Sequence, residues 1–326
     1  TITLPASAEA GDQIVIVDYA RTWGTNNVTI DSNGLNYQGD ADTYTVEYTT
    51  DGQSLNIVYA DSTKGWLPLE DDVVADEPVA PPTQKAMFAY GYNGSAVSSL
   101  KNLVNSSGVI AADVTGVGSA RQRLGGASYG GDKAVFAYGT TGSNVSLKNL
   151  ANNVGVIAAD VTGVGTARSE LQATTYGLDK ALFGWGSATG SDTPLTMTNL
   201  VSNVGTIGSD VTGVGSAHRY AAAVRYGSTG QAMCAFGQVS SGYISIKNLV
   251  SNTGVVSADV TGVGTARHVL AAASYGDDKG IFAYGGGDAV MGFSNLVNSS
   301  GVIASDVTGV GTSRQGLTAA GYSFSA

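Results

Sequence analysis

The chain has 326 residues, among them 46 glycines and 16 tyrosines, and only 13% of the residues are charged. This composition argues against a protein built from long charged helices and favours many short strands joined by glycine turns. A single cysteine, Cys234, excludes an intrachain disulfide framework and a cysteine-ligated zinc site. No stretch approaches the roughly 18 consecutive apolar residues of a membrane-spanning helix, so no membrane insertion is expected.

The net charge of −10 is unevenly distributed along the chain. Residues 1–84 hold 14 acidic residues against Arg21 and Lys64, a net charge of −12. Residues 85–326 hold the other 12 acidic and 14 basic residues, a net charge of +2. A nucleic-acid partner is not expected, because it would require a basic stripe.

The N-terminal segment contains short β-branched and aromatic runs separated by glycine turns. The runs are residues 14–17, 28–30, 44–48 and 55–59. They predict a small antiparallel β domain over residues 1–66. Residues 67–84 (LPLEDDVVADEPVAPPTQ) are acidic and contain proline, which predicts a linker.

The rest of the chain is an internal repeat. The phrase Asp-Val-Thr-Gly-Val-Gly begins at Asp113, Asp160, Asp210, Asp259 and Asp306, at spacings of 47, 50, 49 and 47 residues. This period, with several short apolar runs in each unit, is typical of a β-propeller blade of about four strands. A count of three or four blades plus a cap competes with five blades, but it leaves a strand unpaired at each end.

A complete repeat contains four strand-like runs. In the second repeat these are Lys133–Gly139, Val145–Leu150, Gly155–Asp160 and, before them, a strand of small residues. The first repeat lacks that small-residue strand, whereas the chain ends with a fifth one, Gly316–Ala326. We therefore expect residues 85–326 to form a five-bladed propeller that the C-terminal strand closes, which removes free sheet edges.

The repeated polar residues favour a structural role. A calcium loop supplies several oxygen ligands within a dozen residues, whereas each repeated Asp is followed by Val-Thr-Gly-Val-Gly. We expect these Asp residues and the repeated Arg121, Arg168, Arg267 and Arg314 to make charge-assisted hydrogen bonds between blades. The Gly-Val-Gly turns precede strands, so they do not predict a phosphate loop. No metal and no cofactor is expected.

Catalytic constellations are weak. His218 and His268 do not recur and have no recognisable nucleophile, and Cys234 lies within an apolar run. Glu170 is the one glutamate of the repeat region, which disfavours the carboxylate pair of a glycoside hydrolase. A depolymerase stays an alternative because Asp192, Asp277, Asp278 and Asp288 lie in loops that vary. The chain is predicted not to be an enzyme.

Binding is the favoured use, because the loops vary while the scaffold repeats. The least repeated segments are residues 92–96, 140–144, 187–194, 238–243 and 286–291. The candidate ligand-binding residues in or beside them are Tyr92, Asn93, Asn144, Trp185, Asp192, Tyr243 and Asp288. Trp185 has an alternative interpretation, in which it replaces the tyrosine of the repeated strand.

Two parts of the sequence resemble bacteriophage proteins. The order Thr-Ala-Arg, small-residue strand, Tyr-Gly-x-Asp-Lys-Ala-x-Phe-x-Tyr-Gly resembles Kelch-like propeller repeats of phage tail and other virion proteins, and it covers residues 85–326. Residues 2–18, 32–39 and 59–66 resemble a small β module of phage fibre and spike proteins.

The resemblance implies a virion structural protein on the virion surface, in the tail or the capsid. The N-terminal module would attach to other virion proteins and form a homo-oligomer, a trimer by resemblance. The favoured role is a tail fibre or spike that recognises a host-surface glycan. The alternatives are a capsid decoration or head-fibre protein with a protective or weakly adhesive role, and a soluble propeller lectin.

Overall fold

The computed structural model describes residues 1–42, 45–69, 85–106, 108–188, 193–317 and 319. The chain divides into two compact units, residues 1–83 and 84–324, which are taken separately below. Across the described residues the secondary structure consists of strands, turns and bends without a helix, which confirms the all-β prediction. These residues accordingly contain no helix that could cross a membrane.

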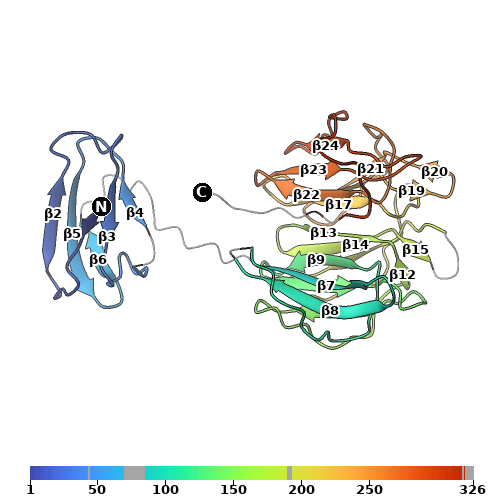
Figure 1. Cartoon of the computed structure of the whole chain (residues 1–326), viewed down its shortest axis with the longest axis horizontal. Coiled ribbons are helices and arrows are strands. Elements are labelled where there is room, and N and C mark those ends of the chain that lie inside the picture. Colours follow the sequence, from blue (N-terminus) through green and yellow to red (C-terminus); the bar gives the residue numbers. More distant parts are fainter. Residues whose placement is uncertain (43–44, 70–84, 107, 189–192, 318, 320–326) are drawn as a thin grey trace. The chain divides into compact units, whose positions relative to one another are not determined.

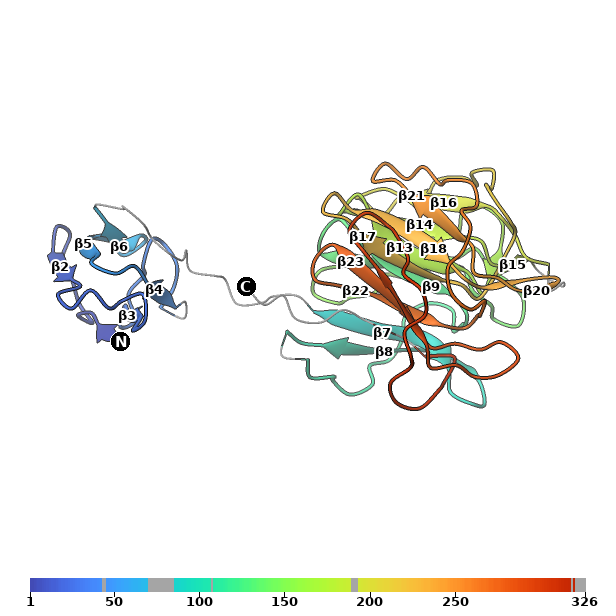
Figure 2. The same cartoon turned by 90° about the horizontal axis from the view of Figure 1, so that it is seen from above.

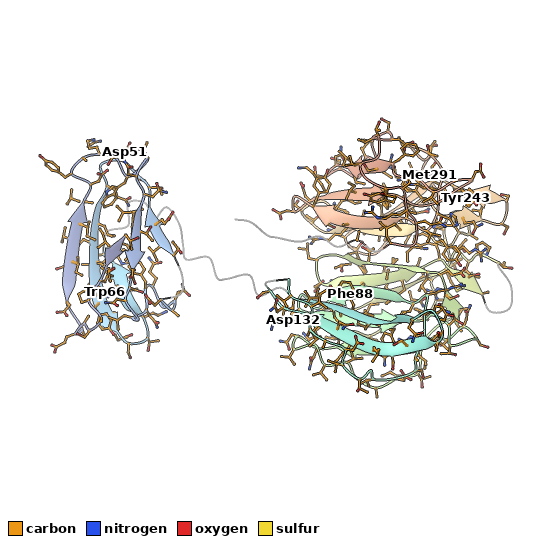
Figure 3. The ribbon with its side chains drawn as sticks, viewed as in Figure 1. Asp51, Trp66, Phe88, Asp132, Tyr243 and Met291 are labelled. Atoms are coloured by element: carbon orange, nitrogen blue, oxygen red, sulfur yellow. The ribbon has the colours of Figure 1, made fainter. Side chains whose placement is uncertain are left out.

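The N-terminal unit consists of two three-stranded sheets (Figure 1). One has the order β1 (Ile2–Thr3), β3 (Val28–Asp31) and β4 (Val46–Tyr48), and the other β2 (Gln13–Val17), β5 (Ser54–Asp61) and β6 (Gly65–Pro68). Exposure alternates along β5, so Leu55, Ile57 and Tyr59 point into one core, with Trp66 (labelled in Figure 3). This alternation buries one face of the sheet.

Two expectations for this unit need correction. The strand β1 pairs in parallel with β3, so the unit is not purely antiparallel. The strand β6 extends to Pro68, two residues into the predicted linker, because Leu67 and Pro68 pair with Val58 and Ile57 of β5. Residues 43–44 and 70–84, which include the start of one predicted strand and most of the linker, lie outside the described residues.

The second unit contains five antiparallel sheets, one for each repeat (Figure 1). Sheet 1 is β7 (Ala86–Tyr92) and β8 (Val97–Val104); sheet 2 is β9 (Gly125–Tyr129), β10 (Lys133–Ala137) and β11 (Lys148–Ala151); sheet 3 is β13 (Gln172–Tyr176), β14 (Lys180–Gly184) and β16 (Thr198–Val201); sheet 4 is β17 (Ala222–Tyr226), β18 (Gln231–Ala235) and β21 (Lys247–Val250); sheet 5 is β22 (Ala271–Tyr275), β23 (Lys279–Ala283) and β24 (Ser294–Val297). Two small ribbons, β12 (Arg168–Ser169) with β15 (Ser187–Ala188) and β19 (Gln238–Val239) with β20 (Gly242–Tyr243), lie at the loops.

The third run of each repeat is not a continuous strand. In sheet 2 it pairs with β11 only through two isolated bridges, Lys148 with Val161 and Ala151 with Ile157. The other four sheets have the same two bridges at equivalent positions. Because the small-residue strand comes first in a blade, this third run is the predicted fourth strand. It is a bridged segment along the edge of its sheet instead of a regular strand.

Neighbouring sheets pack through their small-residue strands. The strands β9, β13, β17 and β22 contact one another in turn, and Figure 2 shows sheets 3 and 4 on the side of the unit away from β7 and β8. Small residues permit this approach: a Cβ added to Gly125 would lie 2.8 Å from the Phe183 ring of the next sheet. Aromatic pairs then seal the interfaces, with Tyr138 edge-on to Phe183 at 5.5 Å.

Sheet 1 has two described strands, whereas sheets 2 to 5 have three. The strand that was predicted to complete it, Gly316–Ala326, lies largely outside the described residues. The described residues therefore establish five successive antiparallel sheets.

Candidate ligand-binding site

The repeated polar side chains lie between neighbouring sheets. Arg121 is fully buried; its guanidinium lies 4.2 Å from the Tyr90 ring centroid, and its Nη2 donates to Asn149 Oδ1 at 2.7 Å. Asn149 in turn donates to Asp160 Oδ1 at 3.0 Å, and Asp160 Oδ2 accepts from the Ser119 N–H and hydroxyl at 2.9 and 2.7 Å. We call this arrangement the clamp. It satisfies a buried cation with a ring, an amide and a carboxylate.

The clamp recurs along the unit. It consists of Arg168, Asn199, Asp210 and Thr166 between sheets 2 and 3, and of Arg267, Asn295, Asp306 and Thr265 between sheets 4 and 5. Burial by itself would raise the pKa of these Asp carboxyls. Hydrogen bonds from the Ser or Thr and the Asn, together with the Arg charge, outweigh burial, so the net pKa lies below its ordinary value. The carboxylates are thus held in their charged form, and the repeated polar residues are occupied by structural contacts.

The residues that were predicted to bind a ligand lie in different environments. Trp185 has no exposed surface and stacks on His218 at 4.9 Å, so it offers no face to a ligand. Asn144 donates to the Ser187 carbonyl at 2.8 Å and ties two loops together. Asn93 Oδ1 accepts the N–H groups of Ser95 and Ala96, which closes its own turn.

The remaining candidates are more accessible. Tyr92 is 56% exposed and its hydroxyl donates to the Gly94 carbonyl, and Asp288 is also exposed. Asp192 lies outside the described residues. Tyr92 and Asn93 come together on sheet 1, whereas Tyr243 lies at a different place, on the β19–β20 ribbon. The structure therefore does not gather the predicted residues into one site.

Tyr243 belongs to an aromatic group formed by two neighbouring loops. Its ring stacks on His268 with centroids 4.7 Å apart and planes inclined by 23°. Figure 3 shows Tyr243 and Met291 near each other at the same edge of the unit. Gly287 lies between them, because a Cβ added there would be 2.7 Å from Met291 Cε and 3.6 Å from Tyr243 Cδ2. The group thus presents stacked aromatic and thioether surface at the loop end of sheets 4 and 5.

A buried carboxylate lies beside this aromatic group. The Glu170 side chain is only 4% exposed; its Oε1 lies 2.7 Å from Arg123 Nη1 and its Oε2 lies 3.1 Å from Arg219 Nη1. The Tyr220 hydroxyl also donates to Glu170 Oε1. The Tyr220 ring is edge-on to His268 at 6.0 Å, which connects the carboxylate to the aromatic group. We call Arg123, Glu170, Arg219, Tyr220, Tyr243 and His268 the Glu170 cluster.

Burial and hydrogen bonding fix the charge states in the Glu170 cluster. Burial, followed by the hydrogen bond to Glu170 and its negative charge, raises the pKa of Tyr220 to about 12. Tyr220 therefore stays protonated near neutral pH and acts as a donor to the carboxylate. The oxygens of Glu170 are already engaged by three donors, so its arrangement is that of an anchor rather than a free acid or base.

The backbone brings these side chains together. Arg123, Glu170, Tyr220 and Val269 all have positive φ, between 50° and 61°. Backbone hydrogen bonds join these four residues in chain order. The N–H of Glu170 donates to the Arg123 carbonyl, that of Tyr220 to the Glu170 carbonyl and that of Val269 to the Tyr220 carbonyl, at 2.8 to 3.2 Å. A left-handed conformation costs a non-glycine residue on the order of 1 kcal/mol or more. The repeated hydrogen bonds compensate for it and stack side chains from successive connections.

Five members of the cluster were missed as site residues: Arg123, Glu170, Arg219, Tyr220 and His268. The signal was present in the two positions after each repeated Arg or His, which read Gln-Arg, Ser-Glu, Arg-Tyr, His-Val and Gln-Gly. These are the most variable positions beside an otherwise constant motif. Only the fold shows that they converge, because they are about 50 residues apart in sequence.

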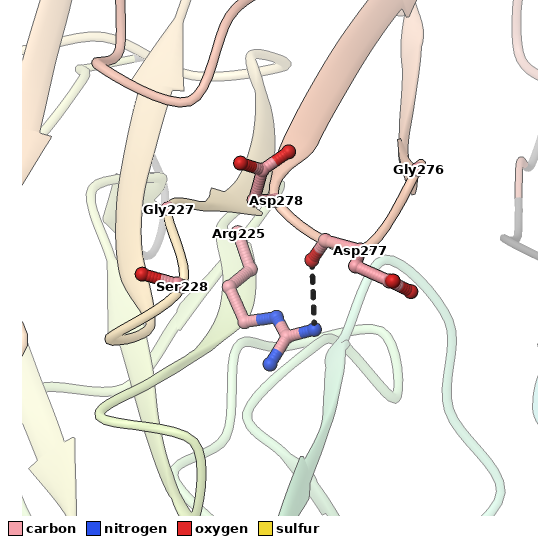
Figure 4. Close-up of a pocket in the computed structure, with 6 residues that line it drawn as sticks. All are labelled: Arg225, Gly227, Ser228, Gly276, Asp277 and Asp278. Atoms are coloured by element: carbon pink, nitrogen blue, oxygen red, sulfur yellow. Dashed lines mark hydrogen bonds between the residues drawn. The ribbon is translucent and has the colours of Figure 1, made fainter. Parts of the chain in front are cut away.

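A second polar site lies at the C-terminal ends of β17 and β22, whereas Tyr220 and His268 of the Glu170 cluster precede these two strands (Figure 4). A pocket of about 500 Å³ is lined by Arg225, Ser228, Asp277 and Asp278, with Gly227 and Gly276. Arg225 Nη2 donates to the Asp277 carbonyl at 3.5 Å, as Figure 4 shows. This pocket has no aromatic side chain on which a sugar ring could stack.

Among the described residues, no group of three or more His, Cys, Asp or Glu side chains could hold a metal ion. Burial raises the pKa of the Cys234 thiol, which makes it a poor ligand or nucleophile. No protein-family model matches the chain, and no curated protein matches it.

Proposed function

We propose that the chain is a bacteriophage virion structural protein, a tail-fibre or spike component that binds a host-surface glycan through the Glu170 cluster. The observation that carries this proposal is the Tyr243 ring stacked on His268 beside a carboxylate and two guanidinium groups. Flat apolar surface next to oriented charged donors and acceptors is what a sugar needs, with its apolar ring face and its rim of hydroxyls.

The departure of the cluster from the repeat supports a specific role. The clamp residues are used again and again to pack the sheets, whereas the members of the Glu170 cluster occur once each. A rigid scaffold with variable side chains at one loop end is the arrangement of many binding proteins. The positive φ of Glu170 and Tyr220 is shared by the equivalent Arg123 and Val269, so the backbone at this position repeats and only the side chain that it carries differs.

The proposed activity is binding without catalysis. Glycoside hydrolysis requires two carboxyl groups on opposite sides of one bond. Glu170 is held by Arg123, Arg219 and Tyr220, and no second carboxylate belongs to its cluster of described residues. Metal and cofactor are not part of the proposal.

We further propose that the five sheets form a five-bladed propeller of the Kelch-like kind, closed by the C-terminal strand. The successive contacts of β9, β13, β17 and β22 support this arrangement, since propeller blades meet through their inner strands. The N-terminal unit would then attach the propeller to other virion proteins and form a homo-oligomer, in the tail or on the capsid. The resemblance to phage virion proteins is the support for this location.

The proposal can be tested by competition. The purified full chain is added to host cells before intact particles, and the rate of particle adsorption is measured. We expect the chain to reduce adsorption, and Tyr243→Ala and His268→Ala to lose most of that effect. Tyr19→Ala is the matched control, because Tyr19 is 98% exposed on the N-terminal unit and has no part in the cluster.

If the folded native chain neither binds cells nor competes, the receptor-binding role is wrong. The alternative role, a capsid decoration or head-fibre protein, would then be favoured. A chain that binds cells equally well with and without Tyr243 would instead place the binding surface elsewhere on the protein.

A further inference from the structure

We infer that sheet 5 docks onto sheet 1 of the same chain through a further clamp at this fifth interface, in which Arg314 donates to Asn102 and Thr312 donates to Asp113. This inference rests on the proposed closed propeller and is independent of glycan binding. It identifies the side chains that hold the two ends of the array together. The inference is based on the two ends of the array: sheet 5 carries the donor residues of a clamp, and sheet 1 carries the acceptor residues.

The donor half is already assembled on sheet 5. The Arg314 guanidinium lies 3.8 Å from the Tyr284 ring centroid, and its Nη1 donates to the Thr312 carbonyl at 3.2 Å. Arg121 makes the same two contacts, with the Tyr90 ring at 4.2 Å and the Ser119 carbonyl at 3.2 Å. Among the described residues, however, neither Arg314 nor Thr312 donates to a neighbouring sheet.

The acceptor half is assembled on sheet 1. Asn102 Nδ2 donates to the Ala111 carbonyl at 3.1 Å and to Asp113 Oδ1 at 2.8 Å. Asn149 makes the corresponding bonds to Ala158 and Asp160, both at 3.0 Å. Within the described part of the chain, Asn102 Oδ1 and Asp113 Oδ2 receive no donor, although the equivalent atoms of Asn149 and Asp160 do.

Apolar side chains at both ends are exposed where their equivalents are buried. Phe88 of sheet 1 is 48% exposed, whereas the equivalent Phe282 is completely buried. Tyr275 of sheet 5 is 41% exposed, whereas the equivalent Tyr226 is 5% exposed. A groove of about 190 Å³ runs along sheet 1 between Phe88, Asn102 and Asp113. Both surfaces would lose their exposed apolar area on docking.

A glycine shows the missing neighbour directly. A Cβ added to Gly118 would lie 2.2 Å from Asp160 Oδ1 of the next sheet, and the equivalent Gly165, Gly215 and Gly264 have the same close contact. The fifth member, Gly311, has nothing within 4 Å. The space that an Asp and Asn pair fills at four interfaces is therefore open at the fifth, and Asp113 with Asn102 is the remaining unmatched pair.

The occupant we favour is the chain's own fifth sheet. The cationic Arg314 complements the anionic Asp113, and the two ends are linked covalently, so their effective concentration exceeds that of a second molecule. A head-to-tail contact with a second copy would use the same atoms. It would also leave free ends and build filaments.

Cross-linking separates these arrangements. Cysteines are placed at Thr312→Cys and Asp113→Cys in a Cys234→Ala chain, and a short dithiol-reactive reagent is added. The matched control pair is Ser119→Cys with Asp160→Cys, whose side chains already meet at 2.7 Å. We expect both pairs to give a cross-link within one chain, identified by peptide mass mapping. A product joining two chains, or no product while the control pair reacts, would overturn the inference.

A stability measurement covers the case in which the cysteine variants fold poorly. Arg314→Ala should lower the thermal midpoint of the repeat unit by as much as Arg121→Ala, because both guanidinium groups would be buried in clamps. If Arg314→Ala leaves the midpoint unchanged while Arg121→Ala lowers it, sheets 5 and 1 do not dock. If the cross-link forms within one chain but the chain does not compete for adsorption, the result counts against the proposed glycan binding and leaves the docking of sheet 5 on sheet 1 in place.

Discussion

The interface between sheets 3 and 4 differs from the interface between sheets 4 and 5, although both follow the same backbone plan. At the second, the buried Arg267 donates to Asn295 Oδ1 at 2.6 Å and lies 4.0 Å from the Phe236 ring centroid. At the first, His218 replaces the Arg and Trp185 replaces the ring, and the two stack at 4.9 Å. The same space is thus filled once by a cation and once by a neutral aromatic pair.

The neutral interface has a different set of hydrogen bonds. His218 Nδ1 bonds the Ser216 carbonyl at 2.9 Å, and Nε2 lies 3.4 Å from Cys234 Sγ, where other sheets have phenylalanine. The imidazole does not reach Asn248, whose Oδ1 is buried without a partner among the described residues. The comparison teaches that each interface requires two planar groups in contact between the sheets. A guanidinium on a ring and an imidazole on a ring both meet this requirement. The two interfaces should therefore lose stability by different amounts on truncation and should respond differently to pH.

The largest difference should appear when the buried groups are truncated. Arg267→Ala removes a buried cation, which leaves Asn295 Oδ1 without its donor and Asp306 without its ion-pair partner, and this should cost about 3 to 5 kcal/mol. His218→Ala leaves a cavity but no unpaired charge, so it should cost less, about 2 to 3 kcal/mol. Urea unfolding measures both, with exposed Lys279→Ala as the control. Equal losses would show that charge does not matter at the clamp.

The second difference is in pH dependence. Burial lowers the pKa of His218 to about 4, below its unfolded value of 6.5. The unfolded chain therefore takes up a proton first, and stability falls as the pH drops from about 6.5 to 4, by on the order of 3 kcal/mol. His218→Phe should remove this slope while Arg267→Lys should retain it. Unfolding free energies measured between pH 7 and 4 test it; an unchanged slope in His218→Phe would exclude His218 as its source.

A smaller difference should separate the two carboxylates. Asp306 lies 3.9 Å from Arg267, whereas the equivalent Asp259 faces the neutral His218. Both accept a hydroxyl hydrogen bond, at 2.6 and 2.7 Å. Each Asp→Ala change loses hydrogen bonds worth about 1 to 2 kcal/mol, and Asp306→Ala should cost roughly 1 kcal/mol more because it leaves Arg267 unpaired. Should Asp259→Ala prove the more harmful of the two, the ion pair would have no stabilising role.

The lowered pKa of Asp306 also predicts an acid effect in its own pH range. Its carboxylate stabilises the fold above the unfolded pKa of 3.8, and this contribution is lost as the pH falls through the lower, folded pKa. The His218 effect is complete before that range begins. The two interfaces should therefore titrate in separate steps when unfolding is followed from pH 7 to pH 2, and the lower step should shrink in Asp306→Ala.

The smallest effect concerns a lysine that sheet 3 lacks. Lys148 Nζ donates to the Gly205 carbonyl at 3.1 Å and Lys247 Nζ to the Gly301 carbonyl at 2.8 Å, but sheet 3 has Thr198 at this position. Thr198→Lys should gain at most about 1 kcal/mol from one added hydrogen bond, and Lys148→Thr should lose a similar amount. Thermal unfolding of both variants, with their double mutant, measures the exchange. A loss of stability in Thr198→Lys would show that this interface is too tightly packed for the longer chain.

The sequence by itself determined the parts of this protein that repeat. The alternation of apolar residues, the glycine turns and the five copies of Asp-Val-Thr-Gly-Val-Gly predict short strands and five similar units, because strand formation and turn geometry depend on neighbouring residues. The first runs of all five repeats are strands, β7, β10, β14, β18 and β23. The repetition also pointed to structural roles for Asp160 and Arg121.

Tertiary structure decided what the repeat does not contain. Glu170, Tyr220 and His268 come from three different connections, and only the packing of successive sheets brings them together. The burial of Trp185 depends on which sheet lies beside which. So does the absence, among the described residues, of a partner sheet for the clamp halves at Asp113 and Arg314. Contacts between residues about 50 or more positions apart are set by how sheets pack, and local sequence carries no record of that choice.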